Sequence, residues 1–533
     1  MVKAYSGSRA EGGAGSEAAV AGHMLDLRGW LEAVDRLGEL HRVDAEVDPE
    51  QEMGGLTYLV ARREGAPALL FNRVHGARPG TRSLFNLLGT SLPRIALAMG
   101  LDPGLDARQV IQQTRLRLKE RIAPQVVDAD SAPVNENVQT GAEVDLDAFA
   151  APRHWPLDGG RYIGTADVVL TRDPDLGHIN VGTYRMMVHD RRHLGLYLSP
   201  GKDARLHITR AWQRGLEVRI AAVLGVHPLW MIIGSQTFPK NVSEYEFIGG
   251  VMGAPLEVVP GLAGDLLFPA RSEIVVEGVI RPNSTRREGP FGEFTGYYGR
   301  PEADCPLVEV TAVHHRDQPI LTNALMADYP SCEMALFYGI AKSARLWDDL
   351  DRYGIPGIQG VWTVPAAASG FGMVVVSLEQ RYAGHAAQVL ALAAQAPSAA
   401  YYTKWIVAVD EDVDPTNIDE VLWAMATRCS PVHDIDILRN TWSTWLDPTL
   451  NPPEVRPWGS KALINACKDH RHLESFSHRT TLYKATWERI AQRWSADFRL
   501  PGEAPELLAY EAADAPVTYH EASDLAQGRP STM

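Results

Sequence analysis

The chain is organised around residues Ser272 to Glu293, which read SEIVVEGVIRPNSTRREGPFGE. The first part of this stretch alternates as a β-strand does, with Ile274, Val276 and Ile280 on one face. Gly278 falls on the same face, where a glycine marks a bulge or a close approach of another backbone. We therefore predict a strand with an irregularity at Gly278, followed by a turn.

The turn is predicted from Gly289, Pro290 and Gly292, which lie within a few residues of each other. It carries two carboxylates, Glu288 and Glu293. A turn of this kind can fold both carboxylates toward one point, and two close carboxylates do not both ionise easily. One of them is then pushed toward its protonated form, which can serve as a general acid near pH 7. The alternative is a surface loop with two solvated glutamates.

This stretch resembles the signature of the UbiD family of reversible decarboxylases, which use prenylated FMN, a modified flavin. In that family the second glutamate of the loop is the proton donor and the first is paired with an arginine. The resemblance implies that Glu293 donates the proton. We hypothesise that Arg185, in an expected strand, points inward and pairs with Glu288, because its planar guanidinium binds a carboxylate through two hydrogen bonds.

The spacing of Asn180, His207 and Glu244 matches no local metal-binding motif. A histidine between two aliphatic residues, as His207 is, is more often structural than a ligand. The resemblance implies otherwise, because relatives use an Asn, a His and a Glu in this order to bind a divalent metal that bridges to the flavin phosphate. Such a ligand set suits Mn²⁺ or Mg²⁺ better than zinc. Several relatives also bind K⁺, largely through backbone atoms.

The predicted contacts with the cofactor come from Asn180, Thr183, Tyr184, Arg185, His207, Ser235 and Glu244. Residues 233–239 are expected to form a strand end and a polar turn whose carbonyl groups could hold a monovalent cation.

Composition and charge limit the classes of protein to which this chain can belong. The chain has 533 residues, 45% of them hydrophobic, and a formal net charge of −15. This charge argues against nucleic acid or an anionic membrane as the main partner. The four cysteines form no Cys-x-x-Cys pair and are interpreted as reduced thiols of a cytoplasmic protein. No apolar run predicts a membrane span.

The fold class is predicted as mixed α/β. The expected divisions are a disordered extension at 1–24, an N-terminal domain at 25–330, a connecting helix at 331–353, an α/β domain at 354–495 and a tail at 496–533. The resemblance implies that the domain at 25–330 binds prenylated FMN and contains a split β-barrel, and that the domain at 354–495 serves oligomerisation. The resemblance also implies a homodimer or higher homo-oligomer, and a flavin prenyltransferase as the supplier of the cofactor.

The implied reaction is the reversible, non-oxidative decarboxylation of an aromatic or α,β-unsaturated carboxylic acid. Two alternatives stay open: an oxidoreductase that uses ordinary FMN, and a non-catalytic partner in the assembly of a decarboxylase. Residues 440–445, which contain two tryptophans, are the candidate wall of the substrate pocket. Their rings favour a flat aromatic acid over a long prenyl chain.

Overall fold

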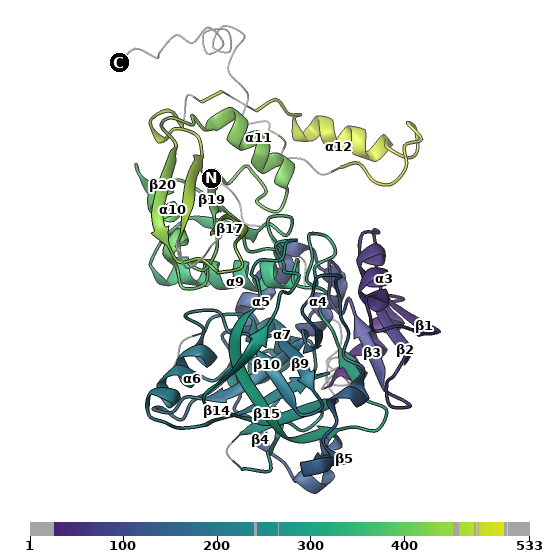
Figure 1. Cartoon of the computed structure of the whole chain (residues 1–533). Helices are drawn as coiled ribbons and strands as arrows, with labels where there is room; N and C mark the ends of the chain where they lie inside the picture. Colours follow the sequence, from purple (N-terminus) through teal and green to yellow (C-terminus); the bar gives the residue numbers. More distant parts are fainter. Residues whose placement is uncertain are drawn as a thin grey trace, which may run out of the picture.

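The computed structural model describes residues 26–238, 242–264, 266–450, 458–473, 476–477, 479–505 and 509. The predicted extension at 1–24 and most of the predicted tail lie outside these residues. Figure 1 shows two bodies, with helix α9 (Phe337–Arg352) at their junction. The predicted connecting helix at 331–353 is thus present, although its helical part begins at Phe337.

The N-terminal part holds a four-stranded sheet with strand order β1-β2-β3-β16. Its strands are β1 (Leu40–Val47), β2 (Ala68–Val74), β3 (Arg82–Phe85) and β16 (Ile320–Thr322). The helices of this part are α2 (Leu27–Arg36), α3 (Glu52–Ala61), α4 (Leu92–Ala98) and α5 (Ala107–Arg117). Because β16 comes from the far end of the next domain, this sheet joins two segments that are distant in sequence.

The largest sheet has nine strands in the order β6-β9-β10-β15-β14-β11-β7-β8, with β5 paired to β15. Its strands are β5 (Asn137–Thr140), β6 (Arg161–Gly164), β7 (Asp167–Arg172), β8 (Ile179–Gly182), β9 (Met186–Asp190), β10 (His193–Leu196), β11 (Val218–Leu224), β14 (Ile274–Glu288) and β15 (Ala303–His315). All of their pairings are antiparallel. The hydrogen-bonded path ends at β6 and β8, and the split barrel stays a prediction.

Around this sheet lie helices and a small three-stranded sheet with the order β13-β12-β4. These elements are α6 (Asp203–Gln213), α7 (Leu229–Gly234), α8 (Glu244–Met252), β4 (Gln125–Val126), β12 (Glu257–Pro260) and β13 (Leu267–Pro269). No helix of the described residues is long and apolar enough to cross a bilayer.

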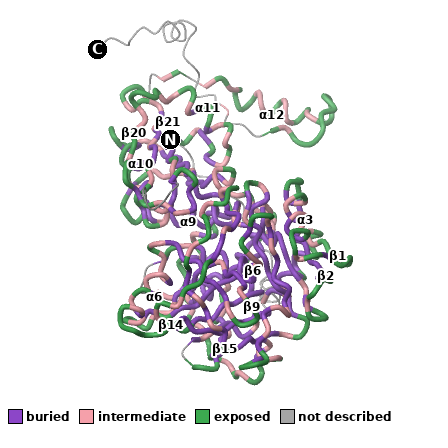
Figure 2. Tube along the Cα trace, viewed as in Figure 1, coloured by how far each residue is buried: buried purple, intermediate pink, exposed green. Residues whose placement is uncertain are grey.

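Strand β14 confirms the predicted alternation. Ile274, Val276 and Ile280 pack into one hydrophobic cluster, while Val275 joins the larger core on the other face. Both faces are therefore buried, as Figure 2 shows for the middle of this domain. The pairing with β15 shifts register at Gly278, where an added Cβ would lie 2.4 Å from Val308 Cγ1. The predicted irregularity is thus a real bulge with a close contact.

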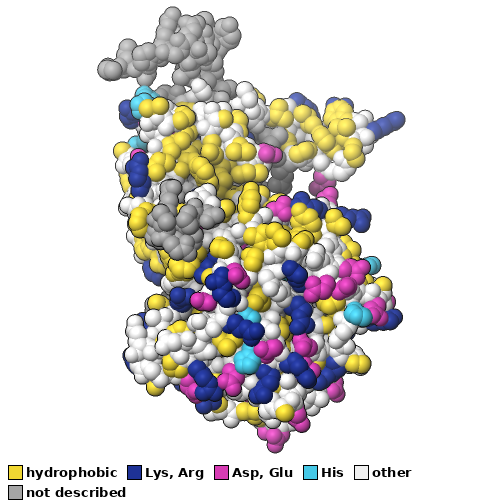
Figure 3. Space-filling view, viewed as in Figure 1, with side chains coloured by type: hydrophobic (Ala, Val, Ile, Leu, Met, Phe, Trp, Pro, Cys, Tyr) yellow, Lys and Arg dark blue, Asp and Glu magenta, His cyan; other side chains and the backbone are white. Residues whose placement is uncertain are grey.

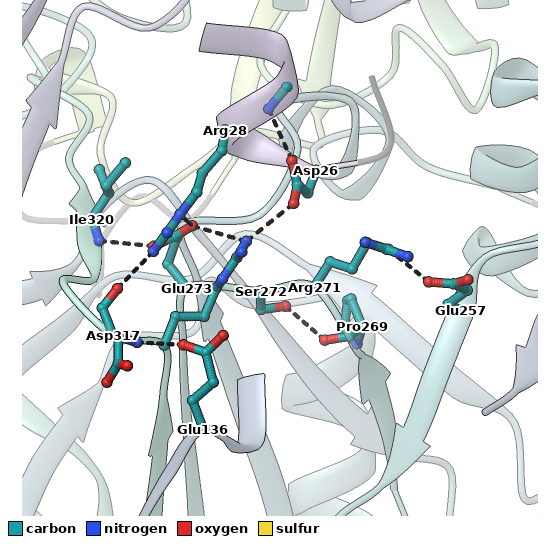
Figure 4. Close-up of polar contacts among 12 residues, drawn as sticks. Asp26, Arg28, Glu136, Glu257, Pro269, Arg271, Ser272, Glu273, Asp317 and Ile320 are labelled. Atoms are coloured by element: carbon teal, nitrogen blue, oxygen red, sulfur yellow. Dashed lines mark hydrogen bonds and ion pairs between the residues drawn. The ribbon is translucent and has the colours of Figure 1, made fainter. Parts of the chain in front are cut away.

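Figure 4 shows how the N-terminal helix is fixed to the start of β14. The carboxylate of Glu273 is completely buried and accepts two hydrogen bonds of 2.8 Å from Arg28 of α2. It also accepts from the backbone N–H of Ile320 at 3.1 Å and lies 3.4 Å from Arg316 Nη1. A buried carboxylate is costly unless it is paired in this way. Glu273 therefore ties α2, β14 and β16 into one rigid base.

The C-terminal part is an α/β layer with strand order β17-β18-β19-β21-β20. Its elements are β17 (Ile358–Thr363), β18 (Met373–Leu378), α10 (His385–Gln395), β19 (Trp405–Asp410), α11 (Ile418–Arg428), β20 (Ile435–Thr441), β21 (Gly459–Ala466) and α12 (Lys484–Arg493). Strands β18, β19 and β21 are parallel. Helix α12 buries none of its residues and projects away from the layer (Figure 1).

Candidate active site and cofactor cavity

The two loop glutamates follow directly from the end of β14, because Glu288 is its last residue. The chain then turns at Gly289, whose φ of +90° is a backbone conformation that favours glycine. Gly159 packs against this turn so closely that an added Cβ would lie 1.9 Å from Gly289 O. Its backbone N–H donates to Pro290 O at 2.8 Å. A residue larger than glycine at position 159 would displace the loop.

Asp158 also holds the glutamate loop in place. Its buried carboxylate accepts hydrogen bonds of 2.9 Å from the backbone N–H groups of Gly292 and Trp155. Burial raises the pKa of Asp158 to about 6, while these hydrogen bonds oppose the shift. The segment before β6 thus builds the platform on which the glutamate loop rests.

Arg185 joins the two loop glutamates. Its Nε lies 2.8 Å from Glu288 Oε1 and its Nη2 lies 3.1 Å from Glu288 Oε2, while Nη1 contacts Glu293 Oε1. Tyr162 also donates to Glu288 Oε1, at 2.9 Å. The predicted ion pair between Arg185 and Glu288 is therefore present. Arg185 lies between strands β8 and β9 and not within a strand, contrary to the prediction.

The two glutamates differ in their protonation. Burial opposes the ionisation of Glu288, but the charge and hydrogen bonds of Arg185 outweigh it and lower the pKa of Glu288. Burial raises the pKa of Glu293 to about 7, and the nearby Glu288 charge adds to this effect although Arg185 opposes it. One guanidinium cannot neutralise two buried carboxylates, so the second carboxyl gains and loses its proton near neutral pH.

A cavity with about 910 Å³ of empty space, including its mouth, lies over Glu293. Four residues predicted to contact the cofactor line it, namely Thr183, Tyr184, Arg185 and Ser235. Further lining comes from α9 and the C-terminal part, namely Phe337, Tyr338, Phe371, Tyr401 and Leu446. Tyr338 stacks on Phe371 with ring centroids 3.8 Å apart. The cavity thus joins a proton donor to a flat aromatic wall, in a volume range typical of ligand sites.

A neighbouring pocket brings together Asn180, His207 and Glu244, which come from β8, α6 and α8. Tyr184 links the two spaces, because it lines the large cavity and its hydroxyl lies 3.5 Å from Asn180 Nδ2. Asp173 also lines the pocket and lies 3.4 Å from His207 Nε2. No sequence pattern had singled out Asp173.

The side chains of this pocket fit a divalent cation. Burial lowers the pKa of His207 and so favours the neutral ring that binds metals, and Thr171 Oγ1 lies 3.0 Å from its Nδ1. Burial raises the pKa of Glu244 to about 7, a cost that a bound cation would remove. No three His, Cys, Asp or Glu residues form a metal cluster among the described residues, so the amide oxygen of Asn180 is needed to complete the set.

Two predictions about residues near the cofactor cavity are wrong. Ile233 lies in helix α7 and not at a strand end, and Ser235 caps that helix with its hydroxyl donating to Ile232 O at 2.8 Å. Pro239 lies outside the described residues. The tryptophans of residues 440–445 do not line the cavity, which instead receives Leu446 from the next position. Trp442 packs edge-on against Tyr401, and so supports the wall from behind.

Comparison with known families matches three family models along the chain. They are the N-terminal domain of 3-octaprenyl-4-hydroxybenzoate carboxy-lyase at residues 31–114, its Rift-related domain at 125–329 and its C-terminal domain at 335–466. Together they cover most of the chain and divide the predicted domain at 25–330 into two.

Curated relatives are decarboxylases. The chain is 32% identical over 452 residues to a phenolic acid decarboxylase of Sedimentibacter hydroxybenzoicus, covering 83% of this chain and 91% of the relative. It is 32% identical over 494 residues to a pyrrole-2-carboxylic acid decarboxylase of Pseudomonas aeruginosa, covering 88% and 98%.

Solved structures of UbiD-class enzymes also match this chain. The closed form of vanillic acid decarboxylase from Sedimentibacter hydroxybenzoicus matches with a TM-score of 0.79 at 30% identity, covering 89% of this chain and 99% of that one. An evolved dimeric form of the UbiD-class enzyme HmfF from Pelotomaculum thermopropionicum, solved in complex with prenylated FMN, matches with a TM-score of 0.74 at 30% identity, covering 86% of this chain and 97% of that one.

Proposed function

The chain belongs to the UbiD family of carboxy-lyases, and we propose that it decarboxylates a small aromatic carboxylic acid with prenylated FMN as its cofactor. The observation that carries the proposal is the buried group of Arg185, Glu288 and Glu293 at the cavity. In it Arg185 lowers the pKa of the Glu288 carboxyl, while burial raises the pKa of Glu293 to about 7. This is the arrangement that a proton-donating decarboxylase requires.

The roles of the three residues follow from their contacts. Arg185 holds Glu288 through two hydrogen bonds and keeps it charged, so that the guanidinium stays fixed at the cavity wall. Its position there lets it orient the substrate carboxylate. When bound, prenylated FMN supplies the electron sink for the pair of electrons left behind as CO₂ departs. Glu293 then transfers its proton to the substrate carbon that has lost CO₂.

Asn180, His207 and Glu244 would hold a Mn²⁺ or Mg²⁺ ion, and that ion would hold the cofactor phosphate. An oxygen, nitrogen and oxygen donor set suits these ions. The ion would also offset the negative charge that a phosphate brings to an acidic protein. A K⁺ ion held by backbone carbonyl groups, and a flavin prenyltransferase that supplies the cofactor, complete the proposal.

The proposed substrate class is a mono- or bicyclic aromatic acid. The cavity wall also carries Tyr338, Phe371 and Tyr401, whose rings suit a flat substrate. The relatives named above act on phenolic, vanillic and pyrrole-2-carboxylic acids.

A substrate panel tests this proposal. The protein is co-expressed with a flavin prenyltransferase, and CO₂ release is measured with hydroxybenzoic, cinnamic, heteroaromatic and polyprenylated hydroxybenzoic acids. We expect at least one small aromatic acid to be the fastest substrate. Faster turnover of the polyprenylated acid than of every small acid would contradict the assignment of substrate class.

Decarboxylation should fall as the pH rises through neutrality. The proton donor must be protonated, and burial sets the pKa of Glu293 at about 7. Its protonated fraction, and with it the rate, should decline about tenfold per pH unit well above that value. The profile of kcat/KM between pH 5.5 and 9 measures this, with cofactor content checked at each pH. A rate that stays flat to pH 9 would assign the proton to another group.

The two alternatives make distinct predictions. An assembly partner without catalysis has no chemical need for a buried arginine bound to two glutamates. An oxidoreductase that uses ordinary FMN would oxidise or reduce its substrate and release no CO₂, so the same panel separates it from a decarboxylase.

We also propose a homodimer or higher homo-oligomer built on the C-terminal part. Figure 3 shows hydrophobic side chains gathered over this part of the molecule. Among the exposed apolar residues of the C-terminal part, Trp405, Leu422 and Ile437 are each about half exposed. Exposed apolar side chains of this size in one region mark an interaction surface.

A further inference from the structure

A second cavity lies on the other side of the glutamate loop. It has about 440 Å³ of empty space, including its mouth, and lies between Tyr58 of α3, Tyr298 of the loop and Asp328. Of the residues that line it, two also line the cofactor cavity, namely Glu293 and Met326. Residue Glu293, the proposed proton donor, therefore lies between the two spaces.

The mouth of this second cavity is polar and reaches solvent. The side chain of Asp328 is 51% exposed and is held by Arg62, whose Nη2 lies 2.6 Å and 2.8 Å from its two carboxylate oxygens. Tyr58 OH donates to Asp328 Oδ1 at 3.3 Å. The hydroxyl of Tyr298 accepts from the backbone N–H of Leu157 at 3.0 Å. A carboxylate and two hydroxyl groups thus lie between bulk water and the loop that carries Glu293.

We propose that this second cavity is the path by which Glu293 regains a proton from solvent after each turnover. The inference rests on the proposed function. In each cycle the substrate carboxylate leaves as CO₂, and the carbon that held it takes the proton of Glu293. The resulting Glu293 carboxylate takes one proton from water in the second cavity. That water is reprotonated by a buffer acid in bulk solvent, through waters at the mouth that donate hydrogen bonds to the Asp328 carboxylate.

The cofactor cavity is a poor route for this proton. During turnover it holds the cofactor and the substrate, and its walls near Glu293 include Phe291, Phe294 and Phe371. These three phenyl rings offer no polar partner to a chain of waters, and the hydroxyl groups of Tyr197, Ser199 and Tyr401 in the same lining face the space that the cofactor and substrate fill during turnover. On that side Glu293 faces Arg185, whose guanidinium stays charged and cannot serve as a proton source.

Replacement of Asp328 tests the path. Asp328→Leu removes the carboxylate that holds water at the mouth and places an apolar side chain there, while Asp328→Asn keeps the shape and loses only the charge. Asp35→Asn is the matched control, because it breaks another exposed arginine–aspartate pair, with Arg42, away from both cavities. The measurement is rapid-quench CO₂ release on holoenzyme at pH 7, over the first and the later turnovers.

We expect Asp328→Leu to release its first CO₂ at the wild-type rate, because that release comes before Glu293 has to regain a proton. Later turnovers should slow by about tenfold or more, which is below the ~10²–10⁴-fold effect of losing a general acid. Raising the buffer concentration should restore part of the rate, and Asp328→Asn should lie between Asp328→Leu and the wild type.

Wild-type steady turnover in Asp328→Leu would overturn the path. A slowed first turnover would overturn it too, because it would indicate that the substitution disturbs the loop or blocks a path by which CO₂ leaves. Absence of CO₂ release from the wild type would instead contradict the proposed function itself.

Discussion

Glu293→Gln should retain bound cofactor and metal at near wild-type levels while CO₂ release falls by roughly 10²–10⁴-fold, the loss typical of a missing general acid. Glutamine keeps the shape of the side chain and can still accept a hydrogen bond from Arg185, so the cavity should stay intact. It has no acidic proton to give to the substrate carbon. The measurements are steady-state CO₂ release, metal analysis and the visible spectrum of the bound flavin.

Glu333→Gln is the matched control for this variant. Glu333 is also buried, with a pKa that burial raises to about 7, and it accepts hydrogen bonds from the backbone N–H groups of Leu88 and Gly89. It does not line the cofactor cavity. Glu333→Gln should therefore keep its activity, within the limits of its stability. Full turnover by Glu293→Gln would show that another group delivers the proton.

His207→Ala and Glu244→Ala should each lose both metal and flavin on purification. Each removes a proposed ligand of the ion that holds the cofactor phosphate. Loss of a group that merely supports a ligand costs ~10–100-fold in metal affinity, so loss of a ligand itself should cost at least that much. Metal analysis and flavin absorbance on the purified variants measure this directly, without any activity assay.

The control for the metal site is His314→Ala. His314 is a buried histidine whose ring contacts Asn135 and Glu277. It lines neither the cofactor cavity nor the pocket proposed to bind the metal. Its loss should lower the stability of the fold but leave metal and flavin bound. Stoichiometric metal and flavin in His207→Ala would contradict the assignment of the ligands.

The sequence predicts those parts of the site whose residues lie close together in the chain. The alternation of β14 and the glycine-rich loop after it fix where Glu288 and Glu293 stand, because a strand and a tight turn are determined by neighbouring residues. The pairing of Arg185 with Glu288 was also predictable, since a buried carboxylate needs a partner and the family pattern names one.

Other parts depend on contacts between distant segments. Tyr338, Phe371 and Tyr401 have the patterns of ordinary core residues, and only the packing of the two domains brings them over Glu293. The short apolar run at Ile233 fits a strand and a buried helix equally well, and the structure selects the helix. The second cavity at Asp328 likewise forms between α3 and the loop, which no spacing in the sequence records.

The central claim is that this chain is a decarboxylase that depends on prenylated FMN and on Glu293. The most direct test is the aromatic-acid panel run on protein purified from cells with and without a flavin prenyltransferase. We expect only the protein from cells with the prenyltransferase to release CO₂ from a small aromatic acid. Equal CO₂ release by protein that holds ordinary FMN, or none from any acid by protein that holds the prenylated cofactor, would contradict it.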